Sequence, residues 1–280
     1  MTEDLWLKHR DRILNYCFMN DIFFSVCFDR NVECVQYVLQ IILDKSDLIV
    51  KSATSQHSIE NFHGRDVRLD VFAEDSAGKL YNIEVQRKDD GAIPQRARYN
   101  SSMLDTENLE KGAKFKALPE TFVIFITEHD VLKGSEQIYH IERVIKETGK
   151  NFGDGSHIIY VNGSIRSGSR LGDLMHDFFC KDPSQMKHAL LASCMKFFKN
   201  PKGGGYIMST AMEELIAEGR AEGKAEGRAE GKAEGKAEGE KKTLLESIRA
   251  LMKRLHWTAE VAMDNLGISP EKQKELAPLI

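Results

Sequence analysis

The chain has 280 residues, of which 41% are hydrophobic and 29% charged, so it can bury one substantial core and still have length for an appendage. Its net charge of -4 excludes attraction of nucleic acid by overall charge, and any contact with phosphate needs a local basic patch. The longest apolar runs, such as residues 37–43, are too short to cross a membrane, and the first residues lack the pattern of a secretory signal. We therefore expect a cytoplasmic protein without a membrane partner.

The first third of the chain is predicted to contain helices and then a hairpin. Between residues 11 and 43, apolar side chains recur at helical spacing, which predicts two helices with a break near 28–31. Two segments that alternate apolar and polar residues follow, at 68–75 and 79–87. The turn sequence between them, Ser76-Ala77-Gly78, predicts a β-hairpin.

The middle of the chain is predicted to alternate helices and strands. Residues 94–109 have a helical pattern, whereas 121–127 and 157–163 are continuous apolar runs of the kind found in buried strands. We expect residues 135–148 to form the helix that crosses between those two strands. Helices before, between and after strands indicate an α/β fold in which a mixed sheet is flanked by helices.

A four-residue repeat, AEGR or AEGK, dominates residues 217–240. Each glycine costs a helix about 1 kcal/mol relative to alanine, and neighbours four residues apart carry like charges, so the repeat alone predicts a solvated, marginally stable tether. The alternative is an oligomerisation stalk, in which small residues let helices of two chains approach closely and pair Glu with Lys or Arg.

The segment beyond the repeat predicts a small helical tail. Thr258 can cap one short helix, and Ser269-Pro270 can begin another. We therefore expect three parts: a main domain over 1–205, a helix and repeat over 206–240, and a tail over 241–280.

The register of the hairpin can be predicted from its turn alone. A three-residue loop that ends in Gly78 makes Asp75 and Lys79 the flanking pair, and Asp70 then faces Glu84. Directly opposed residues have Cβ atoms roughly 5 Å apart, so the two carboxylates should lie side by side, with Gln86 further along the same face. The opposite face predicts a core made of Leu69, Val71, Ala73, Tyr81, Ile83 and Val85.

Two opposed carboxylates repel each other unless a cation lies between them. With Mg²⁺ they suit phosphodiester hydrolysis, because the metal orients and acidifies water and stabilises charge in the transition state. The alternative is that Asp70 and Glu84 lie on the solvated face of an edge hairpin.

Several segments together resemble the Rpn group of recombination-promoting nucleases and transposases, within the PD-(D/E)XK nuclease superfamily. Asp70 and the sequence Glu84-Val85-Gln86 look like the D…E-x-Q version of that superfamily's core. The supporting text, spread over roughly residues 12–200, is NDIFF with a phenylalanine four residues on (20–28), LDVFAEDSAGKLYNIEVQ (69–86), RARY (96–99), LEKG (109–112) and VIFITEHD (123–130).

The resemblance implies a restriction-endonuclease-like fold and a DNA endonuclease that uses Mg²⁺, or Mn²⁺ in its place. It implies metal ligation by Asp70 and Glu84, with the backbone carbonyl of Val85 as a third ligand. Asp21 matches an acidic position that can approach the metal, with helix capping as the alternative. Gln86 stands where most of the superfamily has lysine, and it can orient water or phosphate only by hydrogen bonds.

Three residues of the helix after the hairpin are candidates for substrate contact. Arg96, Arg98 and Tyr99 could reach phosphate, and the alternative is that they are ordinary surface residues. The paired tyrosines of the family are here Tyr99 followed by Asn100.

Two functions remain open at this point. The first is a metal-dependent endonuclease that promotes recombination or transposition, which the pair Asp70 and Glu84 favours. The second is a catalytically silent protein that keeps the nuclease fold as a DNA-binding or oligomeric assembly module. The loss of lysine at position 86 and the acidic net charge favour this second function.

Overall fold

The computed structural model describes residues 2–61 and 64–280. The chain divides into two compact units, Met1–Glu213 and Glu214–Ile280. The first unit contains the sheet and the predicted site, and it is described first.

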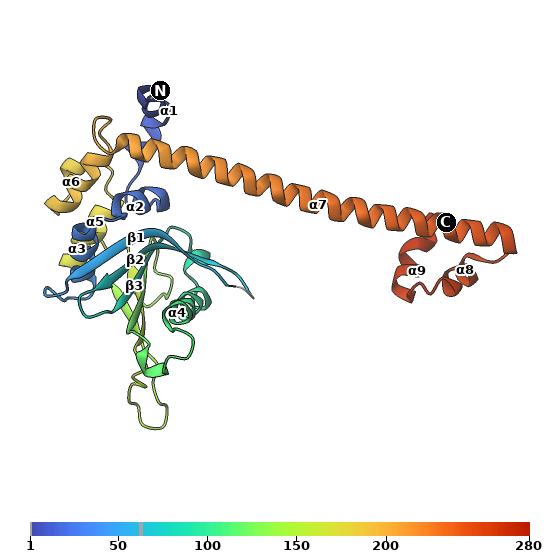
Figure 1. The fold of residues 1–280 in the computed structure, drawn as a ribbon, viewed down its shortest axis with the longest axis horizontal. Helices are drawn as coiled ribbons and strands as arrows, with labels where there is room; N and C mark the ends of the chain where they lie inside the picture. The colour runs from blue at the N-terminus through green and yellow to red at the C-terminus, as the bar shows by residue number, and fades with distance from the viewer. Residues whose placement is uncertain (1, 62–63) are drawn as a thin grey trace. The chain divides into compact units, whose positions relative to one another are not determined.

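In the described part of the chain, six strands form one mixed sheet in the order β1-β2-β3-β4-β6-β5 (Figure 1). The pairs β3·β4 and β4·β6 are parallel, and the other neighbours are antiparallel. The expected α/β fold with a mixed sheet is therefore confirmed. The strands are β1 (Val50–Ile59), β2 (Val67–Asp75), β3 (Leu80–Gln86), β4 (Thr121–Thr127), β5 (Ile138–Ile141) and β6 (Ser156–Asn162).

Helices cover both faces of the sheet (Figure 1). One face packs against α2 and α3 from the N-terminal side and α5 and α6 from later in the chain, in a core rich in phenylalanine. The other face packs against α4, and Ala97 and Leu104 of that helix contact the sheet in a second, smaller core. The bounds are α1 (Thr2–Asn15), α2 (Asp21–Phe28), α3 (Val32–Ile42), α4 (Pro94–Asn108), α5 (Arg170–Phe179) and α6 (Ala189–Phe198), with short 3-10 turns η1 (Asp89–Ala92), η2 (Phe115–Ala117) and η3 (Pro183–Gln185).

The predicted break near residues 28–31 is present, but a second break interrupts the first predicted helix. Helix α1 ends at Asn15, and α2 begins only at Asp21. The carboxamide oxygen of Asn20 accepts a hydrogen bond from the backbone N–H of Cys17 (2.9 Å), and Met19 N–H donates to the carbonyl of Phe178 (3.2 Å). A turn closed by a side chain and fixed to a distant helix replaces the continuous helix that the apolar spacing favoured.

The predicted crossover helix at residues 135–148 is wrong. The segment contains β5, an edge strand paired antiparallel with β6 from Ile138↔Val161 to Ile141↔Ile158. The Tyr139 hydroxyl donates to Asp130 (2.7 Å) and accepts from the N–H of Gly134 (2.9 Å), which fixes the entry to the strand. These contacts depend on a strand edge that a local helical pattern does not reveal.

The second unit, Glu214–Ile280, contains the rest of α7 (Gly205–Leu255) together with α8 (Ala259–Asn265), α9 (Pro270–Leu276) and η4 (Ala277–Leu279). The hydroxyl of Thr258 accepts from the N–H of Val261 (3.4 Å) and caps α8, and Pro270 is the first residue of α9, as predicted. A small core holds these helices together, with Ile248, Met263 and Leu276 buried in it. The repeat 217–240 lies within α7. Among the described helices, none combines the length and the apolar character that a membrane crossing requires.

Candidate active site

The register of the hairpin agrees with the one predicted from its turn. Phe72 pairs with Asn82, and Glu74 pairs with Leu80. Gly78 has a φ of 76°, the left-handed conformation that the third position of the loop requires. The buried carboxylate of Asp75 accepts hydrogen bonds from two N–H groups of the turn and from the Tyr81 hydroxyl (2.7 Å), which fixes the loop.

The backbone ladder between β2 and β3 has its last pair at Val71↔Ile83, and Asp70 and Glu84 come directly after it. The Val85 N–H donates to Oδ2 of Asp70 (3.0 Å), and the Asp70 N–H lies 3.4 Å from Oε1 of Glu84. Each carboxylate therefore interacts with a backbone N–H of the opposite strand, where a regular ladder would use a carbonyl. The two acids lie together at the point where the ladder ends.

Leu69 is not on the face where the alternating pattern predicted it. Val71 and Ile83 belong to the core beneath α2 and α3, whereas Leu69 packs with the residues of α4. On β1, Gln56 lies opposite Asp70, between the paired residues Ser55↔Val71 and His57↔Leu69. The φ of Gln56 is 52°, which departs from extended backbone. The change of face on β2 thus coincides with a residue in the left-handed conformation on the neighbouring strand.

Arg96 of α4 contacts Glu84 directly. Its Nη2 lies 2.7 Å from Oε2 of Glu84, and its Nη1 donates to the carbonyl of Gly91 (2.9 Å). Pro94 occupies the first turn of α4, a favourable position because it needs no N–H partner, and the buried Ala97 packs this turn against the sheet. The arginine is thus held at the acids by its helix and by two hydrogen bonds.

Both acids are enclosed, and this affects their ionisation. Glu84 is fully buried, and burial raises its pKa, with the Arg96 guanidinium offsetting part of the rise. Asp70 keeps some exposure, but its carboxyl group is surrounded by protein; burial and then the charge of Glu84 raise its pKa well above the usual range. Two buried oxygen donors that repel each other favour a cation between them.

Gln86 lies at the end of the same strand, half-buried, and its carbonyl accepts from the N–H of Glu128 (2.9 Å). Its carboxamide oxygen lies against Gly91, so closely that a Cβ at position 91 would overlap it. The absence of a side chain at Gly91 therefore gives room to Gln86, while the carbonyl of Gly91 holds Arg96.

Asp21 is the first residue of α2 and is exposed. Its carboxylate accepts from the N–H of Ile22 (2.8 Å), and its charge contributes to the raised pKa of Asp70. Asp21 is therefore electrostatically close to the pair, as a metal-site residue would need to be, while it also bonds to its own helix terminus.

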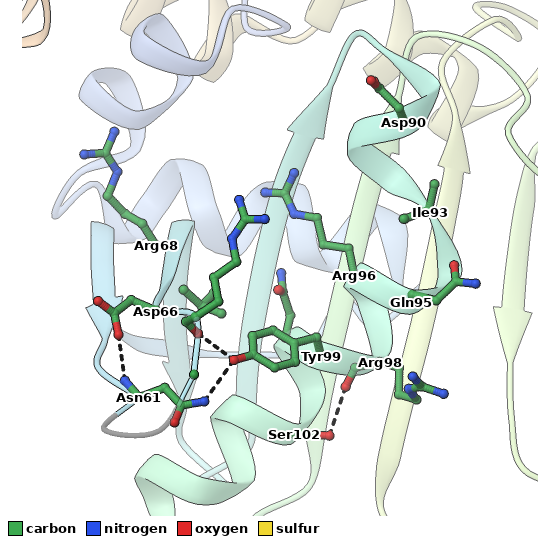
Figure 2. Close-up of a pocket in the computed structure, with 14 residues that line it drawn as sticks. Asn61, Asp66, Arg68, Asp90, Ile93, Gln95, Arg96, Arg98, Tyr99 and Ser102 are labelled. Carbon is green, nitrogen blue, oxygen red and sulfur yellow. Dashed lines mark hydrogen bonds between the residues drawn. The ribbon is translucent and has the colours of Figure 1, made fainter. Parts of the chain in front are cut away.

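The remaining predicted residues lie further along α4. Arg98 is exposed, whereas Tyr99 is half-buried and donates from its hydroxyl to the carbonyl of Arg65 (2.5 Å). The same hydroxyl accepts from the amide of Asn61 (2.9 Å). Figure 2 shows Tyr99 between the side of the site that carries Asn61 and the side that carries Arg96. The sequence analysis did not identify the segment around Asn61 and Arg65 as part of the site. Arg65 and Arg68, which come shortly before Asp70, were a signal that could have identified it.

The donors fit a hard divalent cation. Among the residues that the structure describes, no group of three or more His, Cys, Asp or Glu side chains is arranged as a metal cage. Mg²⁺ does not need such a cage, because it keeps several of its waters and binds through one or two carboxylates. Burial raises the pKa values of both acids, and a divalent cation between them would favour their ionised forms.

A mixed α/β sheet with two enclosed acids at the end of one hairpin places the chain among α/β domains that carry a buried pair of acids at the end of a sheet. Residues 19–164, just over half of the chain, match the family of PD-(D/E)XK nuclease family transposases, and the chain belongs to this family. The match includes the hairpin and the α4 segment, and family membership implies a DNA nuclease role. No curated protein and no solved structure gave a significant match.

Proposed function

We propose that the chain is a metal-dependent DNA endonuclease that hydrolyses phosphodiester bonds with Mg²⁺, or with Mn²⁺ in its place, and that it acts in recombination or transposition. The observation that carries this proposal is the pair Asp70 and Glu84, enclosed at the end of a backbone ladder with raised pKa values. Such an arrangement costs stability and is common where a cation is bound.

Asp70 and Glu84 would hold the metal, with the backbone carbonyl of Val85 as a third ligand and Asp21 close enough to bind through water. When bound, the cation lowers the pKa of a water molecule and stabilises negative charge on the phosphoryl group. The N–H of Val85 orients the Asp70 carboxylate through the 3.0 Å hydrogen bond.

Gln86 and Arg96 together replace the lysine that most of the superfamily has at position 86: Gln86 supplies hydrogen bonds and Arg96 supplies positive charge. Gln86 orients the attacking water or a phosphate oxygen through its carboxamide, but it supplies no charge. Arg96 brings a permanent positive charge to within 2.7 Å of Glu84, and its planar guanidinium can also bind a phosphate. Its presence supports catalysis in a chain that lacks the lysine.

The test is cleavage of supercoiled plasmid by the purified full chain with Mg²⁺ or Mn²⁺. Nicking or linearisation should disappear in EDTA and in Asp70→Asn and Glu84→Gln, which keep the shape of each side chain but remove its charge. Asp173→Asn is the matched control, because Asp173 pairs with Lys187 on the surface of α5, and this variant should cleave like the wild type. Cleavage that survives Asp70→Asn would contradict the proposed site.

The second candidate function is a silent DNA-binding or assembly module, which Gln86 and the net charge of -4 favour. Titration calorimetry separates the two candidates, because a silent module has no need to bind metal. Intact plasmid together with no heat of Mg²⁺ or Mn²⁺ binding would favour this second function over the nuclease.

A further inference from the structure

A hollow of about 950 Å³ has Arg96 in its lining (Figure 2), and the same arginine contacts Glu84 of the acid pair. One wall is formed by Asn61 and by the segment 64–68 that leads into β2. The opposite wall is formed by the first two turns of α4 and by Asp90 and Ile93, which precede that helix.

The lining of this hollow is locally basic although the whole chain is acidic. Four arginines line it against two aspartates: Arg65, Arg68, Arg96, Arg98, Asp66 and Asp90. Asp66 already accepts a hydrogen bond from the N–H of Asn61 (2.8 Å), and Arg96 forms an ion pair with Glu84. Arg65, Arg68 and Arg98 are exposed and belong to the lining, so an anion in the hollow would be surrounded by a local excess of positive charge.

The lining also contains a buried donor that lacks a partner. Asn100 is only 2% exposed, and its amide nitrogen has no hydrogen-bond partner among the residues that the structure describes. A buried unpaired N–H group is costly, and an acceptor from a ligand would remove that cost.

The lining is poorly suited to reading bases. Within its described part, Tyr99 is the one aromatic residue, and its hydroxyl is fixed between Asn61 and the carbonyl of Arg65. Recognition of unstacked bases relies on several accessible aromatic faces, whereas arginine and amide donors suit phosphate oxygens.

We propose that this hollow binds the DNA phosphodiester backbone on one side of the cleaved bond. Arg65, Arg68 and Arg98 contact phosphates, and Asn100 donates a hydrogen bond to a phosphate oxygen at the base of the hollow. The inference rests on the proposed function, and it adds the segment 64–68 and Asn100 to the surface that binds substrate. Binding there is independent of DNA sequence and sensitive to salt.

The test measures binding of a labelled DNA duplex to the full chain in EDTA, by fluorescence anisotropy over a range of salt concentrations. EDTA keeps catalysis out of the measurement. Replacing both Arg65 and Arg68 by alanine should lower the slope of log K against log salt by about two and weaken binding about tenfold or more at low salt. Asn100→Leu should weaken binding several-fold while the slope stays unchanged, because it removes a neutral donor.

The matched control replaces Arg10 and Arg12 of α1, two exposed arginines outside the hollow, by alanine. It makes the same change in net charge and should leave the slope as in the wild type. If the Arg65/Arg68 double variant binds like this control, or if the wild type does not bind duplex at low salt, the hollow is not the DNA-binding surface. A lowered slope with plasmid left uncut in the cleavage test would instead support the hollow and contradict the nuclease.

Discussion

Asp70 and Glu84 illustrate, at the scale of single residues, how a site can lower the stability of the protein that carries it. Both pKa values are raised in the folded chain, so the folded state binds more protons than the unfolded state across that window. Stability is therefore greatest below the unfolded pKa values and falls as pH rises through the raised folded values. Ionisation of the pair therefore destabilises the metal-free fold.

Asp70→Asn should consequently stabilise the protein in EDTA at neutral pH. The asparagine oxygen can still accept from the N–H of Val85, while the repulsion with Glu84 disappears. We expect a gain of about 1 kcal/mol, or roughly 3 °C in Tm, measured by thermal unfolding. Mg²⁺ should raise the Tm of the wild type and not that of the variant. A variant that unfolds at a lower temperature than the wild type in EDTA would refute this account.

Gly91→Ala tests the position of Gln86 without touching either acid. The new methyl group would overlap the carboxamide oxygen of Gln86, which is the end of a flexible side chain and can move aside. We expect plasmid cleavage to fall about tenfold or more, because a small misplacement of a catalytic group has effects of that order, while Tm changes by only a degree or two. The matched control is Gly78→Asn in the hairpin turn, where a left-handed residue is needed and nothing lies within 4 Å. Unchanged cleavage by Gly91→Ala would show that Gln86 needs no fixed position.

At the scale of elements, Lys199 joins the ends of three helices. Its ammonium group donates to the carbonyls of Leu14 (2.9 Å), Tyr16 (2.6 Å) and Lys181 (2.5 Å), which lie at or just beyond the ends of α1 and α5, while Lys199 itself caps α6. Lys199 is buried, so its ammonium group depends on these carbonyls for its hydrogen bonds.

Lys199→Met should therefore destabilise the first unit by about 2 kcal/mol, because it removes three charge-assisted hydrogen bonds to main-chain carbonyls. Chemical denaturation of the full chain measures the effect. Lys196→Met on the exposed side of the same helix is the control, with an expected change within about 0.5 kcal/mol. Equal effects of the two substitutions would mean that the three hydrogen bonds contribute little.

Some helices and strands could be predicted from the sequence, and others could not. The turn of the β2–β3 hairpin and the register of the pairs next to it were predicted correctly, because turn chemistry and alternation are local. Strand β5 was predicted as a helix, because its identity depends on the exposed edge of β6. The contact between Arg96 and Glu84 depends on how α4 packs across the sheet, and neither residue's neighbours in sequence encode it. The change of face at Leu69 coincides with the left-handed conformation of Gln56 on β1, which Leu69's own sequence neighbours do not reveal.

At the scale of the whole molecule, the compact first unit extends into α7. Met208 and Met212 of that helix are buried in the core of the first unit, and Glu213 accepts hydrogen bonds from Lys8 (2.7 Å) and His9 (2.5 Å). The expected three-part division and the role of the repeat 217–240 stay predictions. Removal of everything after Glu213 would keep these contacts.

We predict that the full chain forms oligomers through α7 and the tail, and that a chain ending at Glu213 is monomeric. Small residues at every fourth position of a helix allow close approach of a second helix, which then supplies the charge pairs that the repeat lacks internally. Light scattering coupled to size exclusion measures the mass of each form. A monomeric full chain at tens of micromolar concentration would favour the tether over the stalk.

The place of the two acids at the end of the ladder has a consequence for how such a site changes in evolution. Asp70 and Glu84 interact with backbone N–H groups of the opposite strand, and an amide oxygen at either position could accept from the same N–H group. Because the acid pair lowers the stability of the metal-free fold, selection for folding alone would favour replacement of an acid by its amide in a descendant that no longer cuts DNA. Such a replacement keeps the hairpin and removes the repulsion, so the fold can outlast the chemistry. In comparisons among descendants of this chain, asparagine at position 70 or glutamine at position 84 is the sign of lost catalysis.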